Sequence, residues 1–291
     1  MKKIKGTGVA LITPFKSDMS VDFNSLGKLL KHVIKGCVDY LVVMGTTGEA
    51  ATLTGVEKEE VIDFIINNSE NLPVVLGIGG NNTQEVIDNI NDCKFLDKIE
   101  AILSVVPFYN KPSQEGIYQH YKAIASSTEH SIIMYNVPGR TGVNMTAATC
   151  IRCAEDFNNI IGIKEASGDV DQVTKILKDK PRQFIVVSGE DGITFPLISL
   201  GVEGVISVVA NAFPKDFSEM VSLCRKGEFK KALQYNFRLN EVIDAMFEEG
   251  NPAGVKAFLD DMGIVDNYLR LPLVPVCDIH RSKIGKLLST Y

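Results

Sequence analysis

Lys164 is the residue whose type and position point most directly to chemistry, because it ends the isoleucine-rich run Ile160-Ile161-Gly162-Ile163. Burial at the end of such a run disfavours the charged form of a lysine and leaves a neutral amine. A neutral amine attacks carbonyl carbons to form a Schiff base, which then draws electrons from the adjacent carbon. A lysine that merely extends from a strand end into solvent is the alternative. Glu165 is not expected to pair with Lys164, since adjacent strand residues point to opposite faces.

Two hydroxyl groups lie in a second segment, Gly45-Thr46-Thr47-Gly48. Glycines on either side let the backbone approach a small anion, and the threonine hydroxyls and backbone N–H groups can donate hydrogen bonds to it. The carboxylate of an α-keto acid is an anion of this kind. A glycine-flanked turn without a binding role is the alternative.

Tyr135 and Arg140 add proton transfer and carboxylate binding to this set. A tyrosine hydroxyl can move protons when a hydrogen-bond relay assists it. A planar guanidinium matches a second carboxylate better than an ammonium group does. An ordinary strand-end tyrosine and a solvated loop arginine are the alternatives for these two residues.

The elements that must position these residues alternate between short β-branched runs and longer amphipathic segments. Nearly continuous apolar strands indicate burial on both faces, as in parallel sheets covered by helices. The expected strands are residues 9–12, 40–44, 73–76, 101–106, 132–135, 160–164, 184–187 and 204–208. Eight such units favour an α/β fold, a closed (β/α)8 TIM barrel, with a doubly wound sheet as the alternative because repetition alone does not prove closure.

Helices are expected after each strand, and two of their starts can be recognised. Thr54 with Glu57 forms a capping box, and Asn82 caps the next helix. The other expected barrel helices cover about 23–34, 113–127, 146–155, 170–179, 193–200 and 215–224. We expect residues 1–227 to form the barrel with the active site, and residues 228–291 to form a C-terminal helical region packed on it. The reactive residues follow strand ends, which is where barrel active sites lie.

Charge, hydropathy and cysteine usage exclude several classes of protein. The chain has 291 residues and a net charge of −6, without a block of like charges, so a nucleic-acid partner is not expected. No apolar run approaches the ~18 residues of a membrane helix or makes a secretory signal. The six cysteines lie mostly in apolar stretches, which fits reduced thiols in a cytoplasmic protein. Cys150-x-x-Cys153 has no companion pair, so both are interpreted as helix residues facing a core rather than as a metal or redox site.

Six segments, in this order, resemble the dihydrodipicolinate synthase family of pyruvate-dependent class I aldolase-like barrels, to which N-acetylneuraminate lyases also belong. The resemblance runs essentially from end to end. Its segments are VALITPF (9–15), GTTGE (45–49), PFYNKP (107–112), YNVPGRT (135–141), GIKEASGD (162–169) and LPLVP (271–275).

The resemblance implies a pyruvate site and a metal-free, cofactor-free reaction. Lys164 would form the imine with pyruvate, Thr47 would hold the pyruvate carboxylate, and Gly189 and Ile206 would line the pocket. The enamine would add to aspartate semialdehyde, and cyclisation would release 4-hydroxy-tetrahydrodipicolinate, a step toward diaminopimelate and lysine.

The resemblance also implies a proton relay and an assembly. Tyr135, Thr46 and Tyr109 would form the relay, with Tyr109 supplied by a neighbouring subunit of a homotetramer built from dimers. Arg140 would guide the carboxylate of aspartate semialdehyde.

Within the family, the Gly-Thr-Thr-Gly-Glu segment and Arg140 favour the synthase over the lyase branch. Another pyruvate-dependent aldolase, acting on sialic acid or on a keto-deoxy sugar acid, remains the alternative. Lysine-inhibited members carry a tyrosine and histidines where this chain has Phe108, Gly55 and Lys58. We therefore expect weak or absent feedback by lysine.

Two further classes of function are disfavoured. A phosphate-binding barrel isomerase needs a phosphate site after strands seven and eight, where Ser188-Gly189-Glu190-Asp191 places two acids that repel phosphate. A non-catalytic sensor would keep the pocket but would not need Lys164 together with both threonines and both tyrosines. Fold alone does not separate these classes.

Overall fold

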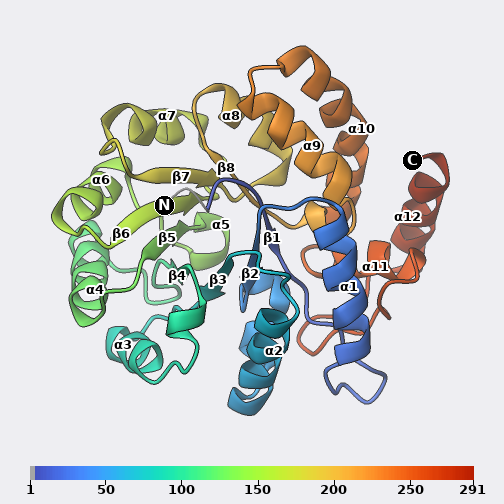
Figure 1. Cartoon of the computed structure of the whole chain (residues 1–291), viewed down its shortest axis with the longest axis horizontal. Coiled ribbons are helices and arrows are strands. Elements are labelled where there is room, and N and C mark those ends of the chain that lie inside the picture. Colours follow the sequence, from blue (N-terminus) through green and yellow to red (C-terminus); the bar gives the residue numbers. More distant parts are fainter. Residues whose placement is uncertain (1–3) are drawn as a thin grey trace.

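Eight parallel strands close into a barrel in the computed structural model, which describes residues 4–291 (Figure 1). Each strand pairs with its neighbours in chain order, and β8 pairs with β1 through the register Gly8 to Ile206. This pairing confirms the (β/α)8 barrel and excludes the doubly wound sheet. The strands are β1 (Gly6–Ala10), β2 (Tyr40–Val43), β3 (Val74–Gly77), β4 (Ala101–Val105), β5 (Ile132–Asn136), β6 (Ile160–Glu165), β7 (Ile185–Ser188) and β8 (Gly204–Ser207).

Helices surround the strands, and the two N-terminal caps predicted from the sequence are confirmed. Thr54 accepts from the Glu57 N–H while the Glu57 side chain accepts from the Thr54 N–H, and Asn82 accepts from the first turn of the next helix. The barrel helices are α1 (Phe23–Lys35), α2 (Gly55–Asn67), α3 (Thr83–Asn91), α4 (Gln114–Ser127), α5 (Pro138–Thr141), α6 (Ala147–Asp156), α7 (Val170–Asp179), α8 (Thr194–Ser199) and α9 (Pro214–Arg225).

Two expectations about these elements were wrong in detail. The first strand covers Gly6–Ala10 rather than 9–12, because glycine and threonine there pair with β2 and β8 although they lack an apolar pattern. A short helix, α5, begins at Pro138 where only a loop was expected. Proline suits the first position of a helix because its missing N–H is not needed there.

The barrel interior is filled by side chains rather than forming a channel. A buried apolar layer includes Tyr40, Val75, Ile133 and Ile206. The Tyr40 ring fits because Gly8 faces it, since a Cβ on Gly8 would lie 2.2 Å from that ring. Its hydroxyl donates to the Val205 carbonyl at 3.0 Å, which satisfies the buried polar group. This packing fills the interior of the barrel with side chains.

Three helices follow the barrel in the chain: α10 (Phe229–Phe247), α11 (Ala253–Asp261) and α12 (Asp278–Thr290). α10 packs on α8 and α9, α11 approaches the turn after β8, and α12 packs on α10 and α11 at the right of Figure 1. A ring contact between Phe213 and Phe258 joins the two parts. These three helices confirm the C-terminal helical part of the predicted fold.

The thiols and the helix lengths bear on two further predictions. Cys150 and Cys153 are buried on α6, as the core-facing interpretation requires, and Cys224 is buried too. Cys93 is half-buried, whereas Cys37 and Cys277 are exposed, so only part of the cysteine set is sequestered. None of the helices within residues 4–291 is long and apolar enough to span a bilayer.

Candidate active site

Lys164 lies near the carboxyl end of β6, between Tyr135 of β5 and Val187 of β7 in the strand register. The residue is 7% exposed, and its Nζ lies 4.3 Å from the centroid of the Tyr135 ring. Its Nζ forms no ion pair or hydrogen bond with any residue from 4 to 291. The structure thus buries the amine at the mouth of the barrel, as the sequence predicted, and places it over an aromatic ring, which the sequence did not predict.

An irregularity in β6 sets the direction of Lys164. The pairing of β5 with β6 shifts between Ile132 and Ile133, so that Ile160 and Gly162 become their partners and Ile161 is skipped. Ile161 joins the interior layer, whereas Ile160 and Ile163 pack outside the sheet. After this bulge the alternation resumes, and Lys164 points inward.

Glu165 points to the other face, as expected from strand alternation. Asn136 Nδ2 donates to both carboxylate oxygens of Glu165, at 3.2 and 3.0 Å. Gln172 Nε2 donates to Glu165 Oε2 at 3.2 Å, and the Ser167 N–H donates to Glu165 Oε1 at 2.8 Å. Burial raises the pKa of Glu165, and these hydrogen bonds oppose the rise. The carboxylate thus ties β5, β6 and α7 together behind the lysine instead of neutralising it.

Gly189 lies against the Lys164 side chain, and its part with Ile206 in lining a pyruvate pocket stays a prediction. A Cβ on Gly189 would sit 2.8 Å from Lys164 Cε and 2.7 Å from the Ala166 Cβ, so the space over the lysine depends on this glycine. Ile206 is 1% exposed and belongs to the interior layer with Tyr135.

The predicted hydroxyl groups lie in residues 44–52, which we call the hydroxyl loop. It consists of two short 3-10 helices, η1 (Thr46–Gly48) and η2 (Ala50–Thr52). Thr47 is buried, and its Oγ1 accepts a hydrogen bond from Asn251 Nδ2 at 2.8 Å. Thr46 is exposed.

Arg140 lies on α5, exposed, with Nη2 3.4 Å from the backbone carbonyl oxygen of Asn251. Asn251 therefore contacts both a predicted carboxylate-binding hydroxyl and the predicted guanidinium. Sequence reasoning missed this residue, because the only local signal was the Gly250-Asn251-Pro252 break between two helices.

Two acids after β7 complete the electrostatics of the site. Burial raises the pKa of Glu190, and the nearby Lys164 and Arg140 side chains oppose that rise. Burial also raises the pKa of Asp191 to about 6, although its Oδ2 accepts from the backbone N–H groups of Val208 and Val209. The Glu190 carboxyl thus lies within electrostatic reach of both the Lys164 amine and the Arg140 guanidinium.

Tyr109 is not brought to the other relay residues within this chain. Its side chain is 88% exposed, with a backbone φ of 70°, and its N–H donates to the Thr141 carbonyl at 3.2 Å. Within residues 4–291, the hydroxyls of Tyr135, Thr46 and Tyr109 form no hydrogen bond with one another. Phe108 is 39% exposed beside it, and the expected weakness of lysine feedback stays a prediction.

A metal centre has no candidate in the part of the chain that the structure describes, where no three His, Cys, Asp or Glu side chains are grouped to hold an ion. What the site does combine is a buried amine, an adjacent phenol, a hydroxyl loop and a guanidinium at the mouth of a parallel barrel. This combination defines a class I aldolase-type enzyme.

Comparisons with known proteins agree with this class. The model of the dihydrodipicolinate synthetase family matches residues 3–291, so the chain belongs to that family. A 4-hydroxy-tetrahydrodipicolinate synthase of Parabacteroides distasonis is 53% identical over 286 residues, covering 98% of this chain and 96% of the relative. One of Phocaeicola vulgatus is 52% identical over 274 residues, covering 94% and 92%.

Solved structures show the same relationship in three dimensions. A dihydrodipicolinate synthase from Acinetobacter baumannii, determined as a pyruvate complex of the chloride-inhibited enzyme, superposes with a TM-score of 0.94 at 40% identity, covering 98% of each chain. The enzyme of Aquifex aeolicus gives a TM-score of 0.94 at 36% identity, covering 99% of this chain and 98% of that one. The family predicted from the ordered sequence segments is confirmed.

Proposed function

We propose that this chain is a 4-hydroxy-tetrahydrodipicolinate synthase, a lyase that condenses pyruvate with L-aspartate 4-semialdehyde in the diaminopimelate route to lysine. The observation that carries the proposal is the buried Lys164 amine, 4.3 Å from the Tyr135 ring and without an ion-pair partner among residues 4–291. The names of relatives more than half identical to this chain support the same activity.

The first half of the proposed reaction takes place on pyruvate. Lys164 Nζ forms a bond with C2 of pyruvate, and the carbonyl oxygen leaves as water. Thr47 and the N–H groups of the hydroxyl loop hold the pyruvate carboxylate, while Gly189 and Ile206 leave space for its small methyl group. Loss of a proton from C3 then gives an enamine, with Tyr135 as the adjacent group that moves protons.

The second half joins the two substrates and frees the lysine. The enamine carbon adds to the aldehyde carbon of the semialdehyde, whose oxygen takes up a proton and becomes the hydroxyl. The ammonium group of the second substrate gives up a proton to solvent, and the resulting amine adds to C2. A proton then passes from its nitrogen to the lysine nitrogen and the bond from C2 to Lys164 breaks, which closes the ring and restores the amine. Arg140 binds the carboxylate of the semialdehyde, and Glu190, which lies near it, supplies the opposite charge for the ammonium group. No metal or organic cofactor enters this balance.

The proposal extends to assembly and location. Tyr109, 88% exposed, completes the relay with Thr46 and Tyr135 of a neighbouring subunit in a homotetramer built from dimers. A tyrosine that enters the site of a partner is exposed in the isolated chain, which supports this assignment. The substrates are soluble metabolites, and we place the enzyme in the cytoplasm. Sedimentation of the purified protein measures the assembly directly.

Borohydride trapping tests the proposed function. Pyruvate and borohydride together should add one reduced pyruvate unit to the protein, and peptide mapping should place it on Lys164. The Lys164→Ala variant should not be trapped, whereas Lys175→Ala, which removes an exposed lysine paired with Asp171 on α7, should be trapped like the parent. Absence of an adduct, or an adduct on another lysine, would refute the mechanism. Faster turnover with N-acetylmannosamine than with aspartate semialdehyde would move the chain to the lyase branch.

A further inference from the structure

The hydroxyl loop is held in a backbone conformation that its residues do not favour. Met44 at its start has a φ of 58°, and Glu49, at the joint between η1 and η2, has a φ of 52°. Non-glycine residues in this region cost on the order of 1 kcal/mol each and persist only where surrounding contacts enforce them. One such contact comes from the segment after β1, since Thr13 Oγ1 donates to the Gly48 carbonyl at 2.7 Å.

The carboxylate of Glu49 is the main long-range contact of the loop. Its side chain and that of Lys256 on α11 are both fully buried, and Lys256 Nζ donates to Glu49 Oε1 at 2.5 Å. The Arg270 backbone N–H donates to Glu49 Oε2 at 3.1 Å. Lys256 also donates to the Tyr268 carbonyl at 2.8 Å. Both carboxylate oxygens of Glu49 are therefore held by residues more than 200 positions further along the chain.

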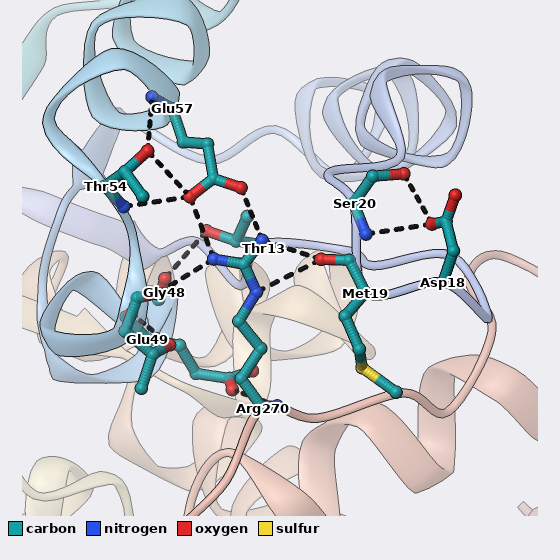
Figure 2. A network of polar contacts seen from close by, with 10 residues as sticks. Thr13, Asp18, Met19, Ser20, Gly48, Glu49, Thr54, Glu57 and Arg270 are labelled. Atoms are coloured by element: carbon teal, nitrogen blue, oxygen red, sulfur yellow. Dashed lines mark hydrogen bonds and ion pairs between the residues drawn. The ribbon is translucent and has the colours of Figure 1, made fainter.

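The Arg270 side chain fixes the other end of the loop (Figure 2). Its Nη1 donates to the Thr52 carbonyl at 2.8 Å, and the guanidinium pairs with the Glu57 carboxylate that also caps α2. It also donates to the Met19 carbonyl, at 3.1 Å from Nε and 2.6 Å from Nη2. One guanidinium thus connects the loop, the first turn of α2 and the chain before α1.

The two cations share one aromatic ring. Lys256 Nζ lies 4.3 Å and Arg270 Cζ lies 4.5 Å from the centroid of the buried Phe15 ring. Burial lowers the pKa of Lys256 to about 8, although the pairing with Glu49 opposes this. The cost of desolvating the buried Glu49–Lys256 pair offsets most of its Coulombic attraction, so a gain in stability explains the pair poorly. Holding the hydroxyl loop in one direction explains it better.

We propose that Glu49, held by Lys256 and Arg270, is a positioning residue that keeps the Thr46 and Thr47 hydroxyls directed toward the pyruvate site. It touches neither substrate and acts through the backbone of the loop. The helix that carries Lys256 begins just after Asn251, so the same segment also places the donor to Thr47 Oγ1. This inference rests on the proposed function, because it assigns the loop to pyruvate.

The test is the double variant Glu49→Gln with Lys256→Met. It removes both buried charges together, leaves no unpaired ion, keeps the side-chain volumes close, and retains an oxygen for the Arg270 N–H. The KM for pyruvate should rise about tenfold, corresponding to the loss of one well-directed hydrogen bond to an anion. The KM for aspartate semialdehyde, which depends on Arg140, should stay within twofold. The matched control is Glu59→Gln with Lys94→Met, the same exchange in an exposed pair, and it should alter neither constant.

A purely structural pair predicts a different result, namely a lower melting temperature with both KM values unchanged, and that result would overturn the inference. Arg270→Lys serves if the double variant does not fold, since it keeps the charge but not the fork that binds Thr52 and Glu57. It should raise the pyruvate KM about threefold, and an unchanged value overturns the inference equally. Trapping of pyruvate on Lys164 of the parent separates the two proposals. If the parent is not trapped there, both the proposed function and the inference are wrong. If the parent is trapped and the variants keep the parental KM for pyruvate, only the inference is wrong.

Discussion

Replacing Gly189 with alanine should displace the reactive lysine without touching any charge. The added Cβ would lie 2.8 Å from Lys164 Cε, 3.1 Å from Lys164 Cγ and 2.7 Å from the Ala166 Cβ. Carbon atoms rest about 3.5–4.0 Å apart, so the new methyl group overlaps the lysine side chain by roughly 0.7 Å or more. The backbone of β6 is fixed by pairing on both sides, so the flexible Lys164 side chain moves. The clash with the Ala166 Cβ shifts the backbone around Ala166 or around position 189 as well, because a Cβ cannot move without its backbone.

A shift of this size acts on the reacting nitrogen itself. Misplacing a reacting group by about 1 Å costs on the order of 100-fold in rate, which corresponds to about 2.7 kcal/mol in the activation barrier. We therefore expect Gly189→Ala to lower kcat about 100-fold. The assay is the initial rate at saturating pyruvate and semialdehyde, together with the time course of borohydride trapping on Lys164. A melting curve shows whether the barrel stays folded.

Gly192→Ala is the matched control from the same segment. A Cβ there would meet only Ile243 Cγ2, at an ordinary distance of 3.7 Å, so kcat should stay within twofold. Two results would refute the reasoning: a Gly189→Ala enzyme with kcat within threefold of the parent, or equal losses in both glycine variants.

Three further outcomes are expected. Burial raises the pKa of Asp191 from 3.8 to about 6, so its ionisation lowers the unfolding free energy of the parent as the pH rises across that interval. The unfolding free energy of Asp191→Asn should therefore rise by up to ~3 kcal/mol relative to that of the parent between pH 4 and pH 7. Parallel pH profiles of the two unfolding free energies would contradict this. Asn251→Ala removes the donor to Thr47 and should raise the pyruvate KM about fivefold. Asn67→Ala, which removes an exposed asparagine on α2, should leave it unchanged. Equal pyruvate KM values in the two variants would show that the hydrogen bond to Thr47 is unimportant. Because Phe108 stands beside Tyr109 where lysine-inhibited members carry a tyrosine, millimolar L-lysine should change the initial rate less than twofold. A steep inhibition curve would disprove that expectation.

The parts of the site that follow strand ends were predictable from sequence. Lys164 and Tyr135 each end an apolar run, and parallel strands in a barrel bring their carboxyl ends to the same face. Strand alternation also assigned Glu165 to the opposite side, which the structure confirms. Local pattern was sufficient here because each inference needed only the period of one strand and the direction of the sheet.

The parts that depend on irregular backbone were not predictable. Strict alternation back from an inward Lys164 would place Ile160 inside and Ile161 outside, but the bulge in β6 reverses this pair. The short helix that presents Arg140 was likewise hidden in a Pro-Gly segment typical of loops. A bulge or a single helical turn changes direction without changing hydropathy, so no periodic signal marks it.

The contacts that hold the hydroxyl loop could not be found from sequence for a different reason, which also bears on how the chain is divided. Asn251, Lys256 and Arg270 lie in the region 228–291 that we predicted as a helical appendage, yet all three contact the hydroxyl loop or the helix that follows it. Nothing local links Glu49 to Lys256, since either residue alone resembles an ordinary surface charge. The boundary at 227 stays a prediction about architecture. The boundary does not separate the site from the rest of the chain, because a barrel ending at residue 227 would lose Asn251, the partner of Thr47, and Lys256, the partner of Glu49. A buried carboxylate left without its cation is strongly destabilising.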